Sequence, residues 1–159
     1  KYYSAPNRDE LVKKKIEFVW FGYFNNWIPQ ENFYYAAKNY NFEVNPLGRS
    51  EGTYNKYASL DDATDPLHYY LAYIKFGIGR STSDAAHEIR DGHITREEGI
   101  QLVKKFDHEI PSNSMDITLD YLNITRDDLE QITSAFRERN TNLWRKTNED
   151  WTLKHAVYK

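Results

Sequence analysis

Residues 65–80 read DPLHYYLAYIKFGIGR, and this stretch decides the fold class. Its aliphatic residues recur every three or four positions, at Leu67, Leu71, Ile74 and Ile78. That spacing predicts a helix with one apolar face. Asp65 is expected to cap the helix, and Pro66 suits its first turn, where an N–H group is not needed. Gly77 and Gly79 predict its end.

The same periodicity continues on both sides of this stretch. Helices are expected near residues 11–16, 29–40, 81–89, 96–106 and 126–136. Thr95 and Thr125 are each followed three residues later by an acidic residue, which is the pattern of a capping box. Gly92 is expected to stop the helix over 81–89.

Two segments favour extended structure. Residues 17–24, EFVWFGYF, are dense in aromatic and β-branched side chains and are predicted to form a buried strand. The tail around Trp144 and Trp151 is expected to form either a last hairpin or an extended docking segment. The predicted fold is therefore mostly α with a minor β contribution, and its one or two strands lie near the start.

Composition limits the function classes. The chain has 159 residues, 16% of them aromatic, which predicts one domain with an aromatic-rich core. Its net charge of −3 argues against nucleic acid, and the absence of cysteine excludes disulfides and thiolate sites within these residues. No apolar run is long enough to span a membrane. Because the first residue is Lys1, we expect a piece of a longer chain.

The first polar cluster covers residues 51–62, EGTYNKYASLDD, in a stretch without periodicity. Long irregular segments in compact domains are often functional. Asp61 and Asp62 are a pair of carboxylates that could hold Mg²⁺ beside a phosphate. The alternative is that both are turn residues ahead of the next helix.

The second cluster is KFGIGRST, residues 75–82. Gly77 and Gly79 would let the backbone approach a ligand, Lys75 and Arg80 flank them, and a helix N-terminus binds anions readily. The glycine spacing of a Walker loop is absent. The alternative is a plain corner between two helices with glycine at the cap.

Histidine adds little to these clusters. His87 and Arg90 are three residues apart, so both side chains could face one anion. No pair of the five histidines has a convincing metal-ligand spacing, and we expect surface or satisfied histidines at all five positions. No arrangement of serine, histidine and aspartate is recognisable as a catalytic triad.

Seven ordered strings carry a family resemblance: EGTY at 51–54, KYASLDD at 56–62, HYY at 68–70, IKFGIGR at 74–80, DAA at 84–86, EIR at 88–90 and GHITREEG at 92–99. They resemble the N-acetyl sugar amidotransferases of bacterial lipopolysaccharide O-antigen and related surface-sugar biosynthesis. The resemblance extends from Gly22 and Trp27 to Trp151. It implies the C-terminal helical part of an α/β enzyme of the PP-loop ATP pyrophosphatase type.

The resemblance also implies a reaction. ATP activates the N-acetyl oxygen of a nucleotide-linked sugar, and ammonia then displaces AMP to leave an acetamidino group. The implied cofactors are ATP and Mg²⁺, and the implied partners are a glutaminase and a cyclase-like protein that supply ammonia in the bacterial cytoplasm. The family's Ser-Gly-Gly-Lys-Asp-Ser type loop and its early cysteines are absent from residues 1–159. We therefore expect a single C-terminal domain that is inactive alone.

Within the matched strings, the resemblance directs attention to cations and hydroxyls. Lys75 and Arg80 are the candidate catalytic residues, for contacts to pyrophosphate or the α-phosphate, because such charges must be placed before the reaction. The candidate substrate-binding residues are Lys56, Tyr57, Ser59, Asp61, Asp62, Gly77, Gly79 and Arg90. No residue is assigned to a metal site held by the protein alone.

The competing hypothesis is a non-catalytic helical domain that docks a glutaminase partner or mediates dimerisation. Exposed Trp144 and Trp151 would suit it, because interfaces are enriched in tryptophan. Convergence of Lys56, Lys75 and Arg80 on one concave polar pocket would favour the enzyme, and their dispersal would favour docking. RNA modification by a PP-loop relative is disfavoured by the acidic balance.

Overall fold

The computed structural model describes residues 3–148 and 150–159. An N-terminal arm carries α1 (Arg8–Lys13) and α2 (Phe21–Phe24), and it leads to α3 (Pro29–Tyr40). The body contains α4 (Asp65–Phe76), α5 (Arg80–Arg90), α6 (Arg96–Phe106), α7 (Met115–Leu122) and α8 (Arg126–Arg139). A hairpin of β1 (Trp144–Thr147) and β2 (Asp150–Leu153) follows. The mostly helical fold class is confirmed.

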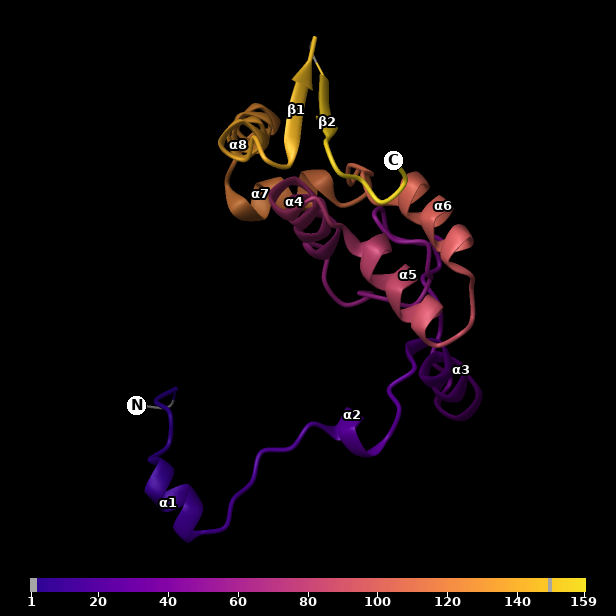
Figure 1. Cartoon of the computed structure of the whole chain (residues 1–159), viewed down its shortest axis with the longest axis vertical. Coiled ribbons are helices and arrows are strands. Elements are labelled where there is room, and N and C mark those ends of the chain that lie inside the picture. Colours follow the sequence, from indigo (N-terminus) through magenta and orange to yellow (C-terminus); the bar gives the residue numbers. More distant parts are fainter. Residues whose placement is uncertain (1–2, 149) are drawn as a thin grey trace.

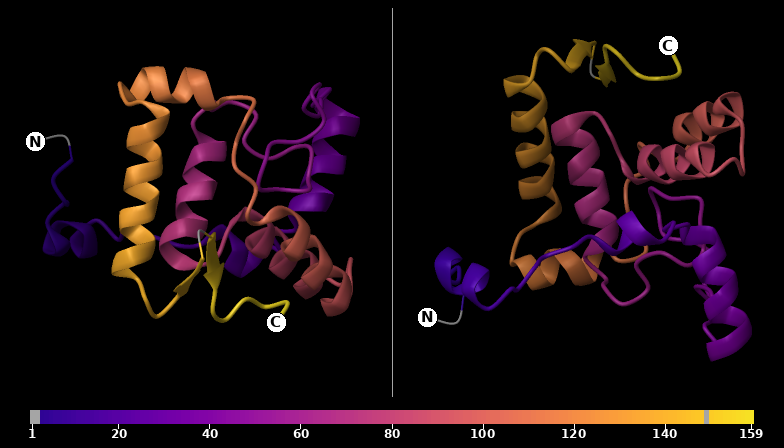
Figure 2. Two further views of the ribbon diagram at one scale, coloured as in Figure 1. Left: turned by 90° about the horizontal axis from the view of Figure 1, so that it is seen from above. Right: turned by 60° about the horizontal axis from the view of Figure 1, so that its bottom comes forward.

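The stretch 65–80 forms the centre of the body. Helix α4 packs in the main core against α7, α8 and the hairpin, with Leu67 and Ile74 almost fully buried. Trp144 of β1 is 3% exposed, and its indole N–H donates to the carbonyl of Ile74 at 2.8 Å. Figures 1 and 2 show α8 and the hairpin beside α4. Leu71 is partly buried against the same core, whereas Ile78 lies beyond the helix end and is exposed.

Helices α5 and α6 form a second packed pair, which projects from α4 (Figure 1). The crossing is close because Gly99 of α6 has no side chain. A Cβ at Gly99 would lie 2.7 Å from Cδ1 of Ile89 and 3.5 Å from Cβ of Ala85. The expected capping boxes at Thr95 and Thr125 are both present, which fixes the starts of α6 and α8.

The expectation of a strand over residues 17–24 is wrong. Residues 21–24 form the one-turn helix α2, and β1 pairs with β2 in the antiparallel hairpin that was one of the two expectations for the tail. Strand propensity needs a partner for the backbone and a surface for the side chains. The arm has neither here: it extends away from the body (Figures 1 and 2), and α1 and α2 contribute no buried residue.

The bounds of α1 and α4 also differ from expectation. Helix α1 ends at Lys13, and Lys15 adopts a left-handed conformation that stops the periodic pattern early. In α4, Asp65 is the first helical residue and Thr64 occupies the N-cap position. Asp62 takes part in this start, because its carboxylate accepts hydrogen bonds from the backbone N–H and hydroxyl of Thr64.

Candidate functional site

A polar cavity of about 330 Å³ lies between α5, the loop 54–59 and the end of the arm. Its lining residues are Trp27, Pro29, Tyr54, Asn55, Tyr57, Ala58, Ser59, Arg80, Ser83, Asp84, His87 and Glu88. Three residues that the sequence proposed for the site, Tyr57, Ser59 and Arg80, are among them. The loop supplies hydroxyl and amide groups, and the helix supplies the charges.

One face of α5 carries the charged residues of the cavity. Arg80, Asp84 and Glu88 follow each other at intervals of four, so their side chains lie along the same side of the helix. Nε of Arg80 donates to Oδ1 of Asp84 at 2.9 Å. The guanidinium group also lies over the ring of Tyr69, with Cζ 5.1 Å from the ring centroid.

Asp84 joins the helix to the loop. Its Oδ2 accepts hydrogen bonds from the hydroxyl of Thr53 at 2.6 Å and from the side-chain amide of Asn55 at 3.0 Å. Oδ1 of Asn55 in turn accepts from the backbone N–H of Ala58 at 2.9 Å, which folds the loop into a turn. One carboxylate therefore sets the shape of the loop wall as well as the position of Arg80.

The surroundings of the acidic side chains in the cavity disfavour their ionised forms. Burial is the main cause that raises the pKa of Asp84, and the hydrogen bonds from Thr53 and Arg80 only partly oppose it. The pKa of Tyr57 is raised to about 12, first by burial and then by the charges of Glu88 and Asp84. The pKa of Tyr54 is raised by the same causes, and its Oη is buried with no hydrogen-bond partner in the described part of the chain.

The start of α5 is occupied by a carboxylate of the chain itself. Asp107, 4% exposed, accepts hydrogen bonds from the N–H of Gly79 at 2.8 Å and from the N–H and hydroxyl of Thr82 at 2.9 and 2.7 Å. The contact requires glycine, because a Cβ at Gly79 would lie 2.7 Å from Asp107. The anion expected at this helix N-terminus is thus internal.

A second ion pair fixes the loop that precedes the cavity. Arg49 and Glu109 form a bidentate pair at 2.6 and 2.7 Å, and Glu109 also accepts from the N–H of Gly52 at 3.0 Å. Arg49 reaches the carbonyl of Thr53 at 3.1 Å as well. The segment 107–109 therefore holds both the start of α5 and the loop that carries Thr53.

The comparison with protein families decides the relationship. Residues 51–158 match the model of the LPS biosynthesis protein WbpG-like, C-terminal domain. The chain belongs to this family. The resemblance to the C-terminal part of these surface-sugar enzymes is confirmed, and involvement in lipopolysaccharide biosynthesis follows from it. No curated protein matches the chain.

Most of the cavity lies in the WbpG-like domain. Its loop 54–59 and its α5 residues fall inside the matched range 51–158, whereas Trp27, at the end of the arm, and Pro29, the first residue of α3, precede it. No helix in the described residues is both long and apolar enough to cross a membrane.

The remaining candidate residues of the sequence lie elsewhere in the WbpG-like domain. Lys56 and Asp61 are exposed, and Asp62 is an exposed turn acceptor before α4. Arg90, at the end of α5, pairs with Asp91 at 3.2 Å. None of these side chains lines the polar cavity.

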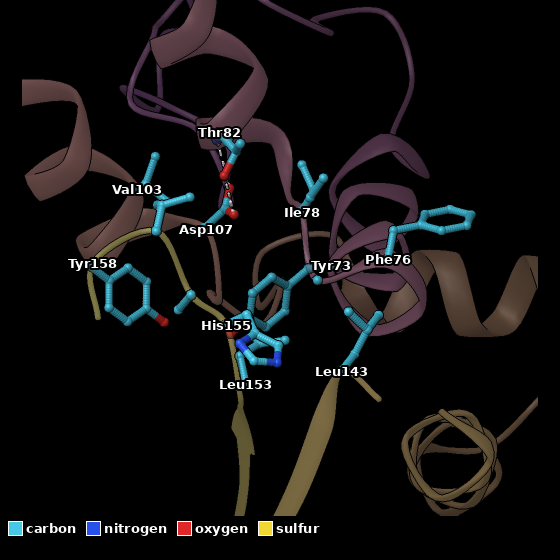
Figure 3. A pocket seen from close by; sticks show the side chains of 13 residues that line it. Tyr73, Phe76, Ile78, Thr82, Val103, Asp107, Leu143, Leu153, His155 and Tyr158 are labelled. Carbon is cyan, nitrogen blue, oxygen red and sulfur yellow. Dashed lines mark hydrogen bonds between the residues drawn. The ribbon is translucent and has the colours of Figure 1, made fainter. Parts of the chain in front are cut away.

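Lys75 and Gly77 lie at the C-terminal end of α4. Nζ of Lys75 is 5.3 Å from the ring centroid of Phe136 in α8. Gly77 is the left-handed C-cap of α4 and lines a different cavity of about 270 Å³, mostly apolar, between α4, α6 and the tail (Figure 3). Of Lys56, Lys75 and Arg80 only Arg80 lines the polar cavity, so the three cations do not converge on one pocket, and this is the arrangement expected of a docking domain rather than of the enzyme.

Sequence reasoning missed several residues that build the site. Thr53, Asn55 and Asp84 all lie within the family strings or beside them, but none was proposed for the site. The interval of four between Arg80 and Asp84 was the available signal, because oppositely charged residues at that spacing pair on a helix. Asp107 and Glu109 gave no local signal, because their partners are distant in sequence. Gly79 lies 28 residues before Asp107, and Arg49 lies 60 residues before Glu109.

Proposed function

We propose that this domain forms the sugar-binding part of an ATP-dependent amidotransferase of surface-polysaccharide biosynthesis. The enzyme would convert the N-acetyl group of a nucleotide-linked sugar to an acetamidino group with ammonia. Family membership supports a biosynthetic role in the lipopolysaccharide pathway. The observation that carries the finer proposal is the polar cavity, in which a partly buried carboxylate, an arginine and three aromatic rings surround a volume of about 330 Å³.

The lining groups suit a sugar with an attached phosphate. Trp27 offers an apolar ring face, and Ser59 and Tyr57 offer hydroxyl groups that can donate or accept. Nε of Arg80 donates to Asp84, and the two Nη atoms would donate to a phosphate oxygen of the substrate. In this proposal Arg80 is the catalytic candidate that the cavity retains.

We do not assign the implied ATP and Mg²⁺ to side chains of these residues. In residues 3–148 and 150–159 no group of three or more histidine, aspartate or glutamate side chains could hold a metal ion. Asp62 is engaged with Thr64, and the start of α5 is engaged with Asp107. In this proposal the nucleotide would be bound by the family's nucleotide loop, which the resemblance places outside these residues, and the domain alone would be inactive.

The remaining elements of the proposal come from the resemblance. Ammonia would be delivered by a glutaminase with a cyclase-like partner, and the reaction would take place in the bacterial cytoplasm before export of the sugar. The ammonia assignment has its own test. If the glutaminase only supplies ammonia, added ammonium salt should restore amidine formation when the glutaminase is omitted.

The proposal is tested by product formation in a chain extended through the upstream reading frame. The extended protein, ATP, Mg²⁺, ammonium and a panel of nucleotide-linked N-acetylated sugars are combined, and mass spectrometry detects replacement of one oxygen by an NH group. ATP–pyrophosphate exchange is measured in parallel. Product only in the extended form supports the proposal. A folded extended chain that gives neither product nor exchange with any sugar overturns it.

A second candidate function, a docking domain, is favoured by the arm. Six aromatic side chains, Phe18, Trp20, Phe21, Tyr23, Phe24 and Trp27, are 61% to 85% exposed. At 150–250 Å² for each side chain, they present roughly 800 Å², which is about the area that one partner buries in a standard interface. Trp144 and Trp151, which the sequence offered for this purpose, instead pack in or against the core.

Docking is tested by the association state. Replacement of Trp20 and Phe21 by serine should abolish any dimer or any complex with the glutaminase seen by light scattering. Replacement of Tyr121 and Ile117, which are exposed on α7, is the matched control. Association that survives loss of the aromatic residues contradicts an arm-based docking function.

A further inference from the structure

We propose that the polar cavity stabilises a positive charge on its ligand, with Asp84 and Glu88 as the anionic groups, so that it binds an amidinium in preference to the corresponding amide. This inference rests on the proposed function for the identity of the reaction. Its binding test does not need an active enzyme. The roles of Asp84 and Glu88 follow from the cavity and not from the family match.

The charge balance of the lining is the first support. One arginine, Arg80, faces two carboxylates, those of Asp84 and Glu88, and His87 adds a positive charge only when it is protonated. Arg80 neutralises Asp84 through their contact at 2.9 Å. Glu88, whose side chain is 15% exposed, contacts Nδ1 of His93 through Oε2 at 2.9 Å.

The acceptor geometry is the second support. A carboxylate has about four lone-pair directions. Asp84 uses two on Oδ2, for Thr53 and Asn55, and one on Oδ1, for Arg80. A direction on Oδ1 remains for a ligand N–H. Glu88 uses Oε2 for His93, and Glu88 itself lies one helical turn beyond Asp84 on the same face of α5.

The aromatic walls are the third support. Trp27, Tyr54 and Tyr57 all line the cavity, and the ring of Tyr57 is itself held by a stack on Phe33 with centroids 4.7 Å apart. Ring faces attract organic cations, and planar cations such as amidinium combine this contact with in-plane N–H donation to carboxylates. The unpartnered Oη of Tyr54 adds a further polar group at the same cavity.

The electrostatics of the tyrosines agree with this arrangement. Burial is the largest cause that raises the pKa of Tyr57 and of Tyr54; the charges of Glu88 and Asp84 raise both further, and Arg80 partly opposes them at Tyr57, so the two carboxylates contribute a negative field at the hydroxyl groups. A field that disfavours a phenolate favours a cation at the same place.

The proposed reaction creates such a cation. The N-acetyl oxygen is first adenylated at the expense of ATP, with pyrophosphate as the leaving group; ammonia then forms a C–N bond at the same carbon, and the C–O bond breaks as the oxygen leaves on AMP. The neutral amide becomes an amidine, which is a strong base and is protonated at neutral pH. Interactions that are stronger with the developing cation than with the amide lower the barrier, whereas uniform binding does not. Asp84 and Glu88 would supply that difference.

The test uses two probes of the same shape, acetamidinium and acetamide. Each is titrated into the ¹⁵N-labelled chain at neutral pH, and the shifts of the Trp27 indole N–H and the Asn55 side-chain amide report occupancy of the cavity. Because charge-assisted hydrogen bonds are about twice as strong as neutral ones, we expect acetamidinium to bind about tenfold more tightly. Added salt should reduce the preference.

Two variants and a control assign the preference to the carboxylates. Asp84→Asn and Glu88→Gln should each reduce it severalfold, and Glu88→Gln remains informative if loss of Asp84 disturbs the loop. Asp120→Asn, an exposed change on α7 with the same loss of charge, should leave it intact. Equal binding of the two probes, or a preference that survives both variants, overturns the inference. Amidine formation without amidinium preference would overturn only this inference, and preference without amidine formation would overturn only the proposed reaction.

Discussion

Replacement of Asp107 by alanine should destabilise the domain by about 3–4 kcal/mol. The carboxylate is 4% exposed and accepts three hydrogen bonds at the start of α5. Its removal leaves the buried N–H of Gly79 without an acceptor, which costs about 2 kcal/mol. The two lost bonds to Thr82 add about 0.5–1 kcal/mol each, because Thr82 is only partly buried.

Urea unfolding followed by tryptophan fluorescence measures this loss. With a slope of about 2 kcal/mol per molar urea, the midpoint should fall by about 1.5–2 M. Asp107→Asn keeps one carbonyl acceptor in nearly the same place, so we expect about half the loss. Hydrogen exchange at the Thr82 amide should accelerate in the alanine variant and less so in the asparagine variant.

Asp62→Ala is the matched control. Asp62 also accepts hydrogen bonds at a helix start, but it is fully exposed, so water replaces the lost partner and the unfolding midpoint should barely move. A loss below about 1 kcal/mol for Asp107→Ala would refute the reasoning, because three bonds to a buried carboxylate cannot be that weak if they hold the helix. Equal losses for Asp107→Ala and Asp62→Ala would refute it as well.

Three further predictions concern the same framework. Gly79→Ala should cost about 1–3 kcal/mol in urea unfolding, because its Cβ would lie 2.7 Å from Asp107, whereas Gly22→Ala meets nothing within 4 Å and should be neutral. Arg49→Ala should cost about 1 kcal/mol and speed hydrogen exchange in the loop 50–53, because a bidentate but partly exposed ion pair is lost; unchanged exchange would contradict the role of this pair. Burial raises the pKa of Asp84, so the folded state holds its proton to higher pH than the unfolded state. Wild type should therefore lose stability relative to Asp84→Asn as the pH rises from about 4 through that raised pKa, and a difference that grows in the opposite direction would contradict the sign.

The helices could be predicted from the sequence because their signals are local. The apolar periodicity of residues 65–78 and the capping residues Thr95 and Thr125 act within a few positions, and the structure follows both. The predicted strand over 17–24 failed for the opposite reason. Its composition suits a buried strand, but only a neighbouring strand or a covering surface would stabilise one.

The candidate site could be predicted only in part. Tyr57 and Ser59 were proposed because they lie in an irregular polar segment, and Arg80 because it flanks two glycines ahead of a helix start; all three line the polar cavity. The glycines were interpreted as a cradle for an external anion, and Gly79 does meet an anion at close range. That anion is Asp107, 28 residues further along the chain, and no sequence pattern indicates which carboxylate will fold back onto a given helix start.

Turnover of the Arg80→Ala variant tests the central claim most directly. In the extended chain with ATP, Mg²⁺, ammonium and the nucleotide-linked sugar, the cavity account predicts that amidine formation falls by orders of magnitude. Arg145→Ala, an exposed change on β1, should leave it unchanged. Lys75→Ala distinguishes the cavity account from the sequence-based prediction that Lys75 is catalytic, because Lys75 lies against Phe136 and outside the cavity. Loss of turnover with Arg80→Ala supports the cavity as the substrate site. Near-normal turnover with Arg80→Ala in a folded protein would contradict it.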